Sequence, residues 1–228
     1  MCICFCFKIK NSSRGITLVE TIVVIFMIAL FSVIVISDFP RIQRYFALSR
    51  ASYSLAQDLR RTEDLGLSGV TLYDVSDPPQ PIGLKGYGFY VNTLLPEQYV
   101  IYADVPNSSN PNPDDDLRYS GGEPYLLCSQ VNQEANGPQL SDCVIELINI
   151  TKNGPNLIIS GFKDINGNAI SVAGISINFT PPNPNINIED DNGNTYSATN
   201  VGIVLGLSND PSLTRTIWVS TSGLINVQ

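Results

Sequence analysis

The longest apolar stretch of the chain lies close to its N-terminus. It runs from Ile16 to Ile36, and its interruptions are Thr17, Glu20, Thr21 and Ser32. A helix of roughly 20 apolar residues is long enough to cross the hydrocarbon core of a bilayer. We therefore expect a transmembrane helix over 16–37. Its one unusual feature is the carboxylate of Glu20, because an acid near the bilayer centre costs roughly 2.5 kcal/mol or more and needs a partner or a function.

A second helical pattern follows, and it is amphipathic. Residues at three-and-four spacing form a stripe: Ile42, Tyr45, Leu48, Leu55 and Leu59, with Ser52 and Thr62 beside them. Most charged residues lie off this stripe, so one helix face can pack against a sheet. Pro40 predicts either a kink or break near the membrane surface or the first turn of a new helix. Gly66 and Gly69 offer the left-handed conformation that ends helices, so we expect the amphipathic helix over 38–69.

The remaining chain, 70–228, has the pattern of a β-rich domain. Residues 70–85 contain Pro78, Pro79 and Pro81 and predict a connecting loop. The segments rich in aromatic and β-branched residues are 87–91, 98–103, 144–150, 157–162, 169–179, 201–207, 214–220 and 223–227. Asn-Gly pairs between some of them are hairpin turn signals. The predicted fold class is α+β, a long N-terminal helix packed on a mostly antiparallel sheet.

The segment Arg14-Gly15-Ile16-Thr17-Leu18-Val19-Glu20 resembles the processing site of type IV prepilins. The resemblance implies that 1–15 is a leader peptide, that a prepilin peptidase cuts between Gly15 and Ile16, and that the new amine of Ile16 is methylated. It also implies a partner for Glu20, whose carboxylate would pair with the amine of Ile16 on a neighbouring subunit and set filament register. The alternative is an ordinary signal anchor with an accidental acid.

The order of elements after the helix looks like that of GspH/FimT-type minor pseudopilins. The similarity rests on 87–91, 99–104, 217–219 and 222–225. It implies a head of two packed β-sheets with the helix against one side. The chain departs from this pattern by a long segment rich in Asn, Pro and Asp after Asp104.

Charge and topology place this head outside the cytoplasm. The formal net charge is -8, and loss of 1–15 would remove three of the 13 basic residues and none of the 21 acidic ones. So acidic a domain argues against direct nucleic-acid binding. Lys8, Lys10 and Arg14 precede the apolar run, and the positive-inside rule keeps them cytoplasmic. No Ala-x-Ala cleavage signal follows the run, so we expect the segment to stay attached to an extracytoplasmic domain.

Two of the five cysteines fall in the expected head. Cys2, Cys4 and Cys6 belong to the leader, whereas Cys128 and Cys143 remain in the processed chain. An extracytoplasmic location permits a disulfide between them, and the alternative is two separately buried thiols. A zinc site is less favoured, because two cysteines without histidine leave the usual four-ligand shell incomplete.

Acidic residues gather after the second predicted strand. They are Asp104, Asp114, Asp115, Asp116 and Glu123. Their hard oxygen ligands suit calcium, but the spacing does not match an EF-hand. The sequence leaves two interpretations, a weak calcium site and a solvated acidic loop. The segments 164–168 and 190–194 also alternate oxygen donors, and we interpret both as hairpin turns.

Catalytic motifs are missing from the sequence. It has no histidine, no nucleophile elbow, no phosphate loop and no metal motif. Trp218, the only tryptophan, lies between Ile217 and Val219 and is interpreted as a core or edge packing residue rather than a stacking platform. We therefore expect a protein that is not an enzyme.

The expected function is that of a structural filament subunit. The resemblance favours a minor pilin or pseudopilin of a type IV pilus or type II secretion-like filament. It implies other pilins, the prepilin peptidase, an assembly platform in the cytoplasmic membrane and membrane lipid as partners, with the head finally on the pilus or cell surface. The alternative is an uncleaved membrane-anchored binding domain that captures calcium or a carbohydrate. A third interpretation keeps the pilin but assigns its filament to DNA uptake.

Overall fold

The structure is a computed structural model with one long helix, two five-stranded antiparallel sheets and one two-stranded sheet, which confirms the α+β class. It describes residues 16–73, 75–105, 118–119, 125–130, 142–181, 185–196 and 200–228. The chain divides into two compact units, Met1–Gln43 and Arg44–Gln228. The first contains the N-terminal half of the helix, and the second contains its C-terminal half with all the strands.

Helix α1 spans Leu18–Ser68 and includes Pro40. Two of the alternatives expected at Pro40, a break and the first turn of a new helix, are therefore wrong. Loss of one backbone donor removes one helical hydrogen bond without ending the helix. At the other end, Gly69 has a φ of 58° and adopts the left-handed conformation expected after a helix. Gly66 instead lies inside α1, where an added Cβ would lie 2.6 Å from the Cβ of Phe179, so its role is close packing.

The C-terminal half of α1 buries one face in the head. Its buried residues are Leu48, Ala51, Ser52, Leu55, Ala56, Leu59 and Thr62. Two members of the predicted stripe, Ile42 and Tyr45, are exposed instead. Tyr45 packs its ring under Arg215, whose guanidinium carbon lies 5.1 Å from the ring centroid and which donates a hydrogen bond to the tyrosine hydroxyl. The apolar stripe is thus buried only from Leu48 onward.

The first sheet has the strand order β5-β4-β3-β8-β9, and every pairing in it is antiparallel. Its strands are β3 (Gly86–Asn92), β4 (Gln98–Asp104), β5 (Cys143–Asn149), β8 (Gly174–Thr180) and β9 (Asn185–Asp190). The long segment between β4 and β5 is the insertion expected after Asp104. Two 3-10 helices, η1 (Cys128–Gln130) and η2 (Ile150–Asn153), lie before and after β5.

The second sheet has the order β12-β11-β10-β6-β7 and is also antiparallel. Its strands are β6 (Leu157–Lys163), β7 (Ala169–Ile170), β10 (Asn200–Leu207), β11 (Asp210–Ser220) and β12 (Ile225–Val227). A separate pair, β1 (Leu72–Tyr73) and β2 (Pro81–Ile82), lies in the predicted loop. The predicted strand 169–179 is wrong as one element, because β7 and β8 belong to different sheets. β9 was not predicted.

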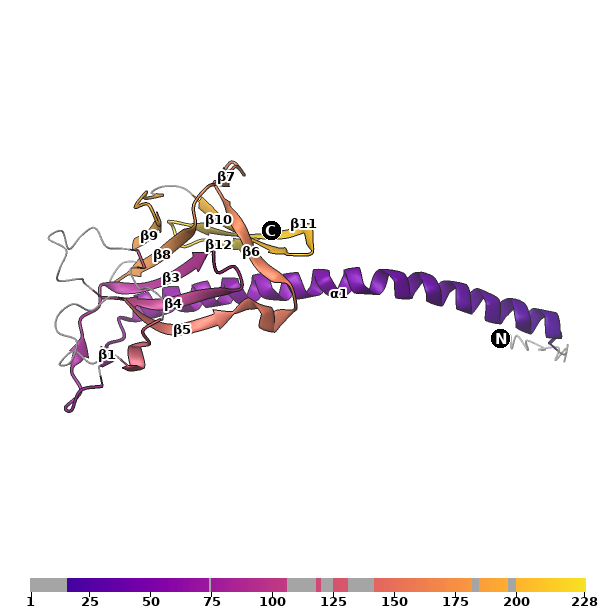
Figure 1. Cartoon of the computed structure of the whole chain (residues 1–228), viewed down its shortest axis with the longest axis horizontal. Helices are drawn as coiled ribbons and strands as arrows, with labels where there is room; N and C mark the ends of the chain where they lie inside the picture. Colours follow the sequence, from indigo (N-terminus) through magenta and orange to yellow (C-terminus); the bar gives the residue numbers. More distant parts are fainter. Residues whose placement is uncertain are drawn as a thin grey trace, which may run out of the picture. The chain divides into compact units, whose positions relative to one another are not determined.

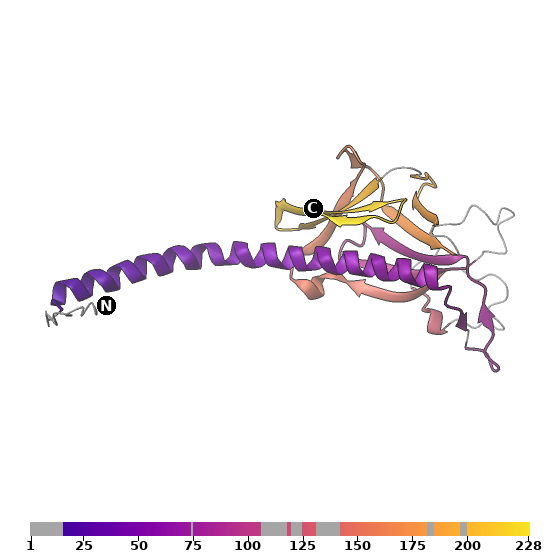
Figure 2. The ribbon, with the colours of Figure 1, turned by 180° about the vertical axis from the view of Figure 1, so that it is seen from behind.

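Side chains from both sheets and from α1 form one hydrophobic core. In Figures 1 and 2 the C-terminal half of α1 runs alongside the strands of the head, and in Figure 2 it lies over them. The helix residues Leu48, Leu55 and Leu59 meet side chains such as Phe89 of the first sheet and Ile203 of the second. Burial of these large apolar groups, each worth about 1.5–3 kcal/mol, holds the helix to the sandwich.

Candidate functional site

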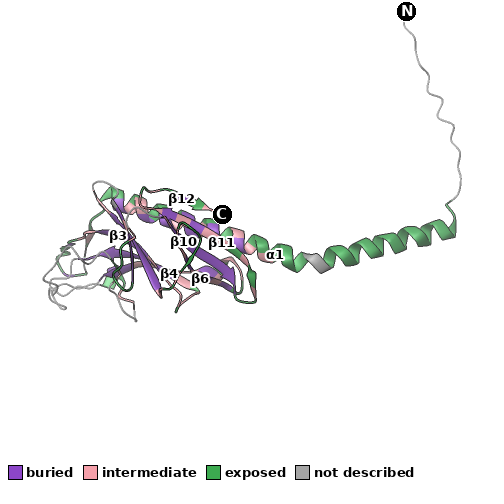
Figure 3. Ribbon diagram, turned by 90° about the horizontal axis from the view of Figure 1, so that it is seen from above, coloured by how far each residue is buried: buried purple, intermediate pink, exposed green. Residues whose placement is uncertain are grey.

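The N-terminal half of α1 is an apolar surface without a packing partner in the described chain. Every large apolar side chain from Ile16 to Ile36 is exposed, with Ile25 at 61%. Figure 3 shows this half of α1 as exposed and the strands of the head as largely buried. By length and composition, α1 is a helix that could span a membrane. An apolar surface of this extent is stable in lipid or against other apolar helices.

Glu20 lies in the first turn of α1, where a negative charge is favourable to the helix dipole. Thr17 organises this turn: its hydroxyl accepts a hydrogen bond from the backbone N–H of Glu20 at 3.3 Å, and its carbonyl accepts one from the Thr21 hydroxyl. Within the described residues, the carboxylate of Glu20 has no hydrogen-bond or ion-pair partner. Ile16, the expected first residue after cleavage, is exposed. Gly15 lies outside the described residues.

The expected calcium ligands are only partly described. Asp114, Asp115, Asp116 and Glu123 lie outside the described residues. Asp104 is buried at the end of β4, and its Oδ2 accepts a hydrogen bond of 2.7 Å from Asn178 Nδ2. Across the described part of the chain, no group of three or more acidic, cysteine or histidine residues could hold a metal ion. The observed contact of Asp104 joins strands β4 and β8.

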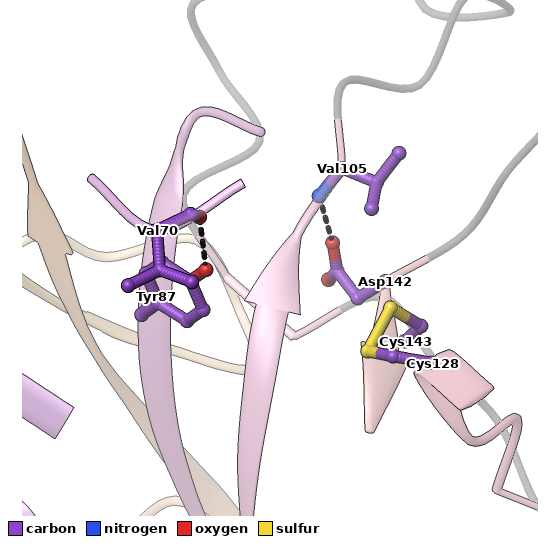
Figure 4. Close-up of a disulfide and its surroundings, with 6 residues drawn as sticks. All are labelled: Val70, Tyr87, Val105, Cys128, Asp142 and Cys143. Carbon is purple, nitrogen blue, oxygen red and sulfur yellow. Dashed lines mark hydrogen bonds between the residues drawn. A yellow bond between two sulfur atoms is a disulfide. The ribbon is translucent and has the colours of Figure 1, made fainter. Parts of the chain in front are cut away.

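The ends of the insertion are fixed beside a disulfide between Cys128 and Cys143, drawn in Figure 4. The carboxylate of Asp142, directly before β5, accepts a hydrogen bond of 3.0 Å from the backbone N–H of Val105. The two cysteines pack with apolar residues that include Tyr87 and Val105. These contacts hold the segments that leave β4 and enter β5 next to each other.

The segments 164–168 and 190–194 have the same turn geometry, as expected for hairpins. In the second, Asp190 Oδ1 accepts hydrogen bonds from the backbone N–H groups of Asn192 and Asn194, both at 2.9 Å. Its Oδ2 accepts from Asn194 Nδ2 and from the hydroxyl of Tyr196. Burial alone would raise the pKa of Asp190, but these hydrogen bonds lower it below its ordinary value. The carboxylate is thus committed to the turn.

Several contacts that fix α1 to the head were missed by sequence reasoning. Tyr99 of β4 donates a hydrogen bond to Asp58 Oδ2. Arg61 forms an ion pair of 2.7 Å with Glu146 of β5, while Arg60 donates to the backbone carbonyl of Ile225 in β12. The charged residues lie off the buried stripe, as predicted, but no local pattern shows which strand edge each would reach.

Two features therefore define the candidate site. One is the exposed apolar helix, whose first turn carries an acid without a partner among the described residues. The other is a head whose two five-stranded sheets bury their own core. Comparisons of the chain with protein-family models, with curated proteins and with solved structures found no match.

Proposed function

We propose that this protein is a structural subunit, a minor pilin or pseudopilin, of a type IV pilus or type II secretion-like filament. It is made as a prepilin, cut between Gly15 and Ile16 by a prepilin peptidase, and methylated on the amine of Ile16. Before assembly it is held in the cytoplasmic membrane with its N-terminus inside and its head outside. An assembly platform in that membrane then transfers it to the filament.

The observation that carries the proposal is the unequal burial along α1. The head completes its core with the helix residues from Leu48 onward, so the apolar residues 16–36 are not needed for its packing. In the membrane, lipid covers those residues. In a filament, the same helices of neighbouring subunits replace the lipid, and the apolar surface becomes the filament interior.

Glu20 gives this assembly its register. A carboxylate surrounded by apolar helices needs a cationic partner, and the free amine of Ile16 on a neighbouring subunit supplies one. A buried ion pair of this kind adds little net stability but penalises every alignment that leaves the acid unpaired. Subunits would therefore enter the filament at one axial offset.

The proposal is tested by replacing Glu20→Ala in cells that carry the rest of the machine. We expect the variant to be absent from sheared filaments, whereas its head stays folded with the Cys128–Cys143 disulfide intact. Thr21→Ala is the matched control, because the Thr21 hydroxyl donates a hydrogen bond within its own helix turn, to the carbonyl of Thr17. Normal incorporation of Glu20→Ala would contradict the register role.

A further inference from the structure

The sequence contains four copies of the triplet Asn-x-Ser/Thr, in which the middle residue is not proline. They begin at Asn11, Asn107, Asn149 and Asn178. In extracytoplasmic proteins this triplet is the acceptor signal for N-linked oligosaccharides, and the side-chain amide of the asparagine receives the sugar. So short a signal also arises by chance, and the local structure has to separate the copies. Asn11 belongs to the expected leader, and Asn107 lies outside the described residues.

The fold excludes Asn178 as an acceptor. Asn178 lies in β8, which runs between β3 and β9, and its side chain is fully buried. Its Nδ2, the atom that would carry the sugar, donates a hydrogen bond of 2.7 Å to Asp104 Oδ2. A sugar on this atom would break that hydrogen bond and place a large polar group in a buried position, which is energetically unfavourable.

Asn149 lies where the chain leaves the first sheet. It is the last residue of β5, an edge strand, and it is also the N-cap of η2. Its side chain is half-buried, and Lys152 in the following turn is exposed. Acceptor asparagines are expected in surface turns of this kind, because a sugar attached there can extend into water.

Thr151 fixes the orientation of the Asn149 amide. Asn149 Oδ1 accepts hydrogen bonds from the backbone N–H of Thr151 at 2.8 Å and from the Thr151 hydroxyl at 2.5 Å. A backbone N–H needs an acceptor, so the bonded atom is the amide oxygen and Nδ2 is the other branch of the amide. In the part of the chain that the structure describes, Nδ2 makes no hydrogen bond. The asparagine and the hydroxyl residue of the triplet thus contact each other and leave the acceptor atom available.

We propose that Asn149 is a site of N-linked glycosylation. The donor is an oligosaccharide joined through a diphosphate to a membrane lipid, and a transferase on the outer side of the membrane catalyses the transfer. Asn149 Nδ2 attacks the first carbon of the sugar, so a C–N bond forms while the bond from that carbon to the diphosphate oxygen breaks. Nδ2 loses one proton to a base of the transferase, and the lipid diphosphate leaves. This modification requires the extracytoplasmic location of the head given under the proposed function, but neither cleavage nor filament assembly.

The test is a peptide analysis of the protein purified from its own membranes. The protein is digested, and the peptides are sequenced by mass spectrometry with a fragmentation that leaves sugars attached. We expect a sugar on Asn149 and none on Asn178. Unmodified Asn149, or a sugar on Asn178 of the folded chain, would overturn the proposal. Methylated Ile16 together with unmodified Asn149 would leave the filament role intact, whereas a sugar on Asn149 of a chain that still carries 1–15 would support glycosylation and contradict prepilin processing.

Substitutions at Thr151 separate the acceptor signal from the fold. Thr151→Ala removes the hydroxyl and should lower the modified fraction of Asn149 at least tenfold. Thr151→Ser is the matched control, because it keeps a hydroxyl and should retain the sugar. Asn149→Gln removes the acceptor and should remove the sugar completely. The Cys128–Cys143 disulfide is measured in each variant as a sign of a folded head, and a folded Thr151→Ala variant that keeps its sugar would overturn the proposal.

Discussion

The two halves of α1 are one helix in opposite environments. Ile25 in the first half is 61% exposed, whereas Leu59 in the second is fully buried. The first half is rich in β-branched residues, which are moderate helix formers in water, but in lipid a helix satisfies every backbone group internally. The helical conformation of the second half is stabilised by packing against the two five-stranded sheets. One continuous helix therefore has a half that the head buries and a half that the head leaves exposed.

The carboxylates of the head and the carboxylate of Glu20 differ in their hydrogen bonding. In the head, the carboxylates of Asp58, Asp104, Asp142 and Asp190 each accept a hydrogen bond from another residue of the same chain. The carboxylate of Glu20 has none among the described residues. Under the proposal above, the amine of Ile16 on a neighbouring subunit supplies the partner that Glu20 lacks among the described residues.

The largest effect is expected from shortening one apolar side chain in the second half of α1, and no effect is expected from the same change in the first half. Leu59→Ala should lower the free energy of unfolding of the head by about 2–5 kcal/mol, because it leaves a cavity in a packed core. Ile25→Ala should leave that free energy unchanged, because Ile25 is exposed and is not a member of the hydrophobic core. Urea unfolding in detergent micelles, followed by the fluorescence of Trp218, measures both. Equal losses in the two variants would contradict the division of α1.

A smaller effect is expected from the contact between Asp58 and Tyr99. Tyr99→Phe should cost about 1.5–3 kcal/mol, the usual worth of a hydrogen bond to a charged group. Burial, reinforced by the hydrogen bond to Asp58, raises the pKa of Tyr99 well above its ordinary value of 10.0. The contribution should therefore be fully present below about pH 10 and be lost only as the pH rises further.

Tyr53→Phe is the control for this prediction. Tyr53 lies on the same helix, but it is exposed. Its hydroxyl can be removed without leaving a buried group unpaired, so stability should stay within about 0.5 kcal/mol of the wild type. A loss in Tyr53→Phe as large as that in Tyr99→Phe would remove the basis for assigning the effect to Asp58.

The smallest effect is expected at the turn after β9. Asp190→Asn keeps an acceptor for the backbone donors but replaces the Oδ2 that accepts from Asn194 and Tyr196 by an amide nitrogen. It should therefore cost about 1–1.5 kcal/mol at pH 7. Because folding lowers the pKa of Asp190 below 3.8, its contribution is present above that value and disappears as the pH falls through the native pKa. Unfolding curves of variant and wild type should thus converge in acid. A constant difference down to pH 2 would count against this role.

The fold was predictable where one period of the pattern persists. The apolar run, the amphipathic stripe from Leu48 and the central strands of both sheets all follow from spacing alone. The strand 169–179 was wrong because its apolar residues continue across 171–173, where the chain passes from one sheet to the other. The helix continues through Pro40 because a long helix stays stable when one backbone N–H donor is missing. β9 carries alternating Asn and Ile residues between turn signals, and its pairing partner β8 decides its conformation.

The candidate site was predictable where the chemistry is local. Glu20 is conspicuous because its neighbours in sequence are apolar, and Asn-Gly pairs identify both hairpin turns. The adjacency of β6 and β10 in the second sheet was not predictable, because these two strands are far apart in the sequence and meet only in the folded sheet. Asp104 could be found as an acid but not as a partner of Asn178, 74 residues away. Contacts between strands that are far apart in the sequence depend on the strand order of the sheets, which cannot be predicted from a short motif.

The central claim is tested most directly by the intact mass and the N-terminal peptide of the protein purified from its own membranes. The account predicts a chain that begins at a methylated Ile16, which requires removal of residues 1–15 by a prepilin peptidase. A chain that still carries Met1 to Gly15, in cells whose other prepilins are cut, would contradict it. The membrane-anchored binding domain would then be the better account of the exposed helix.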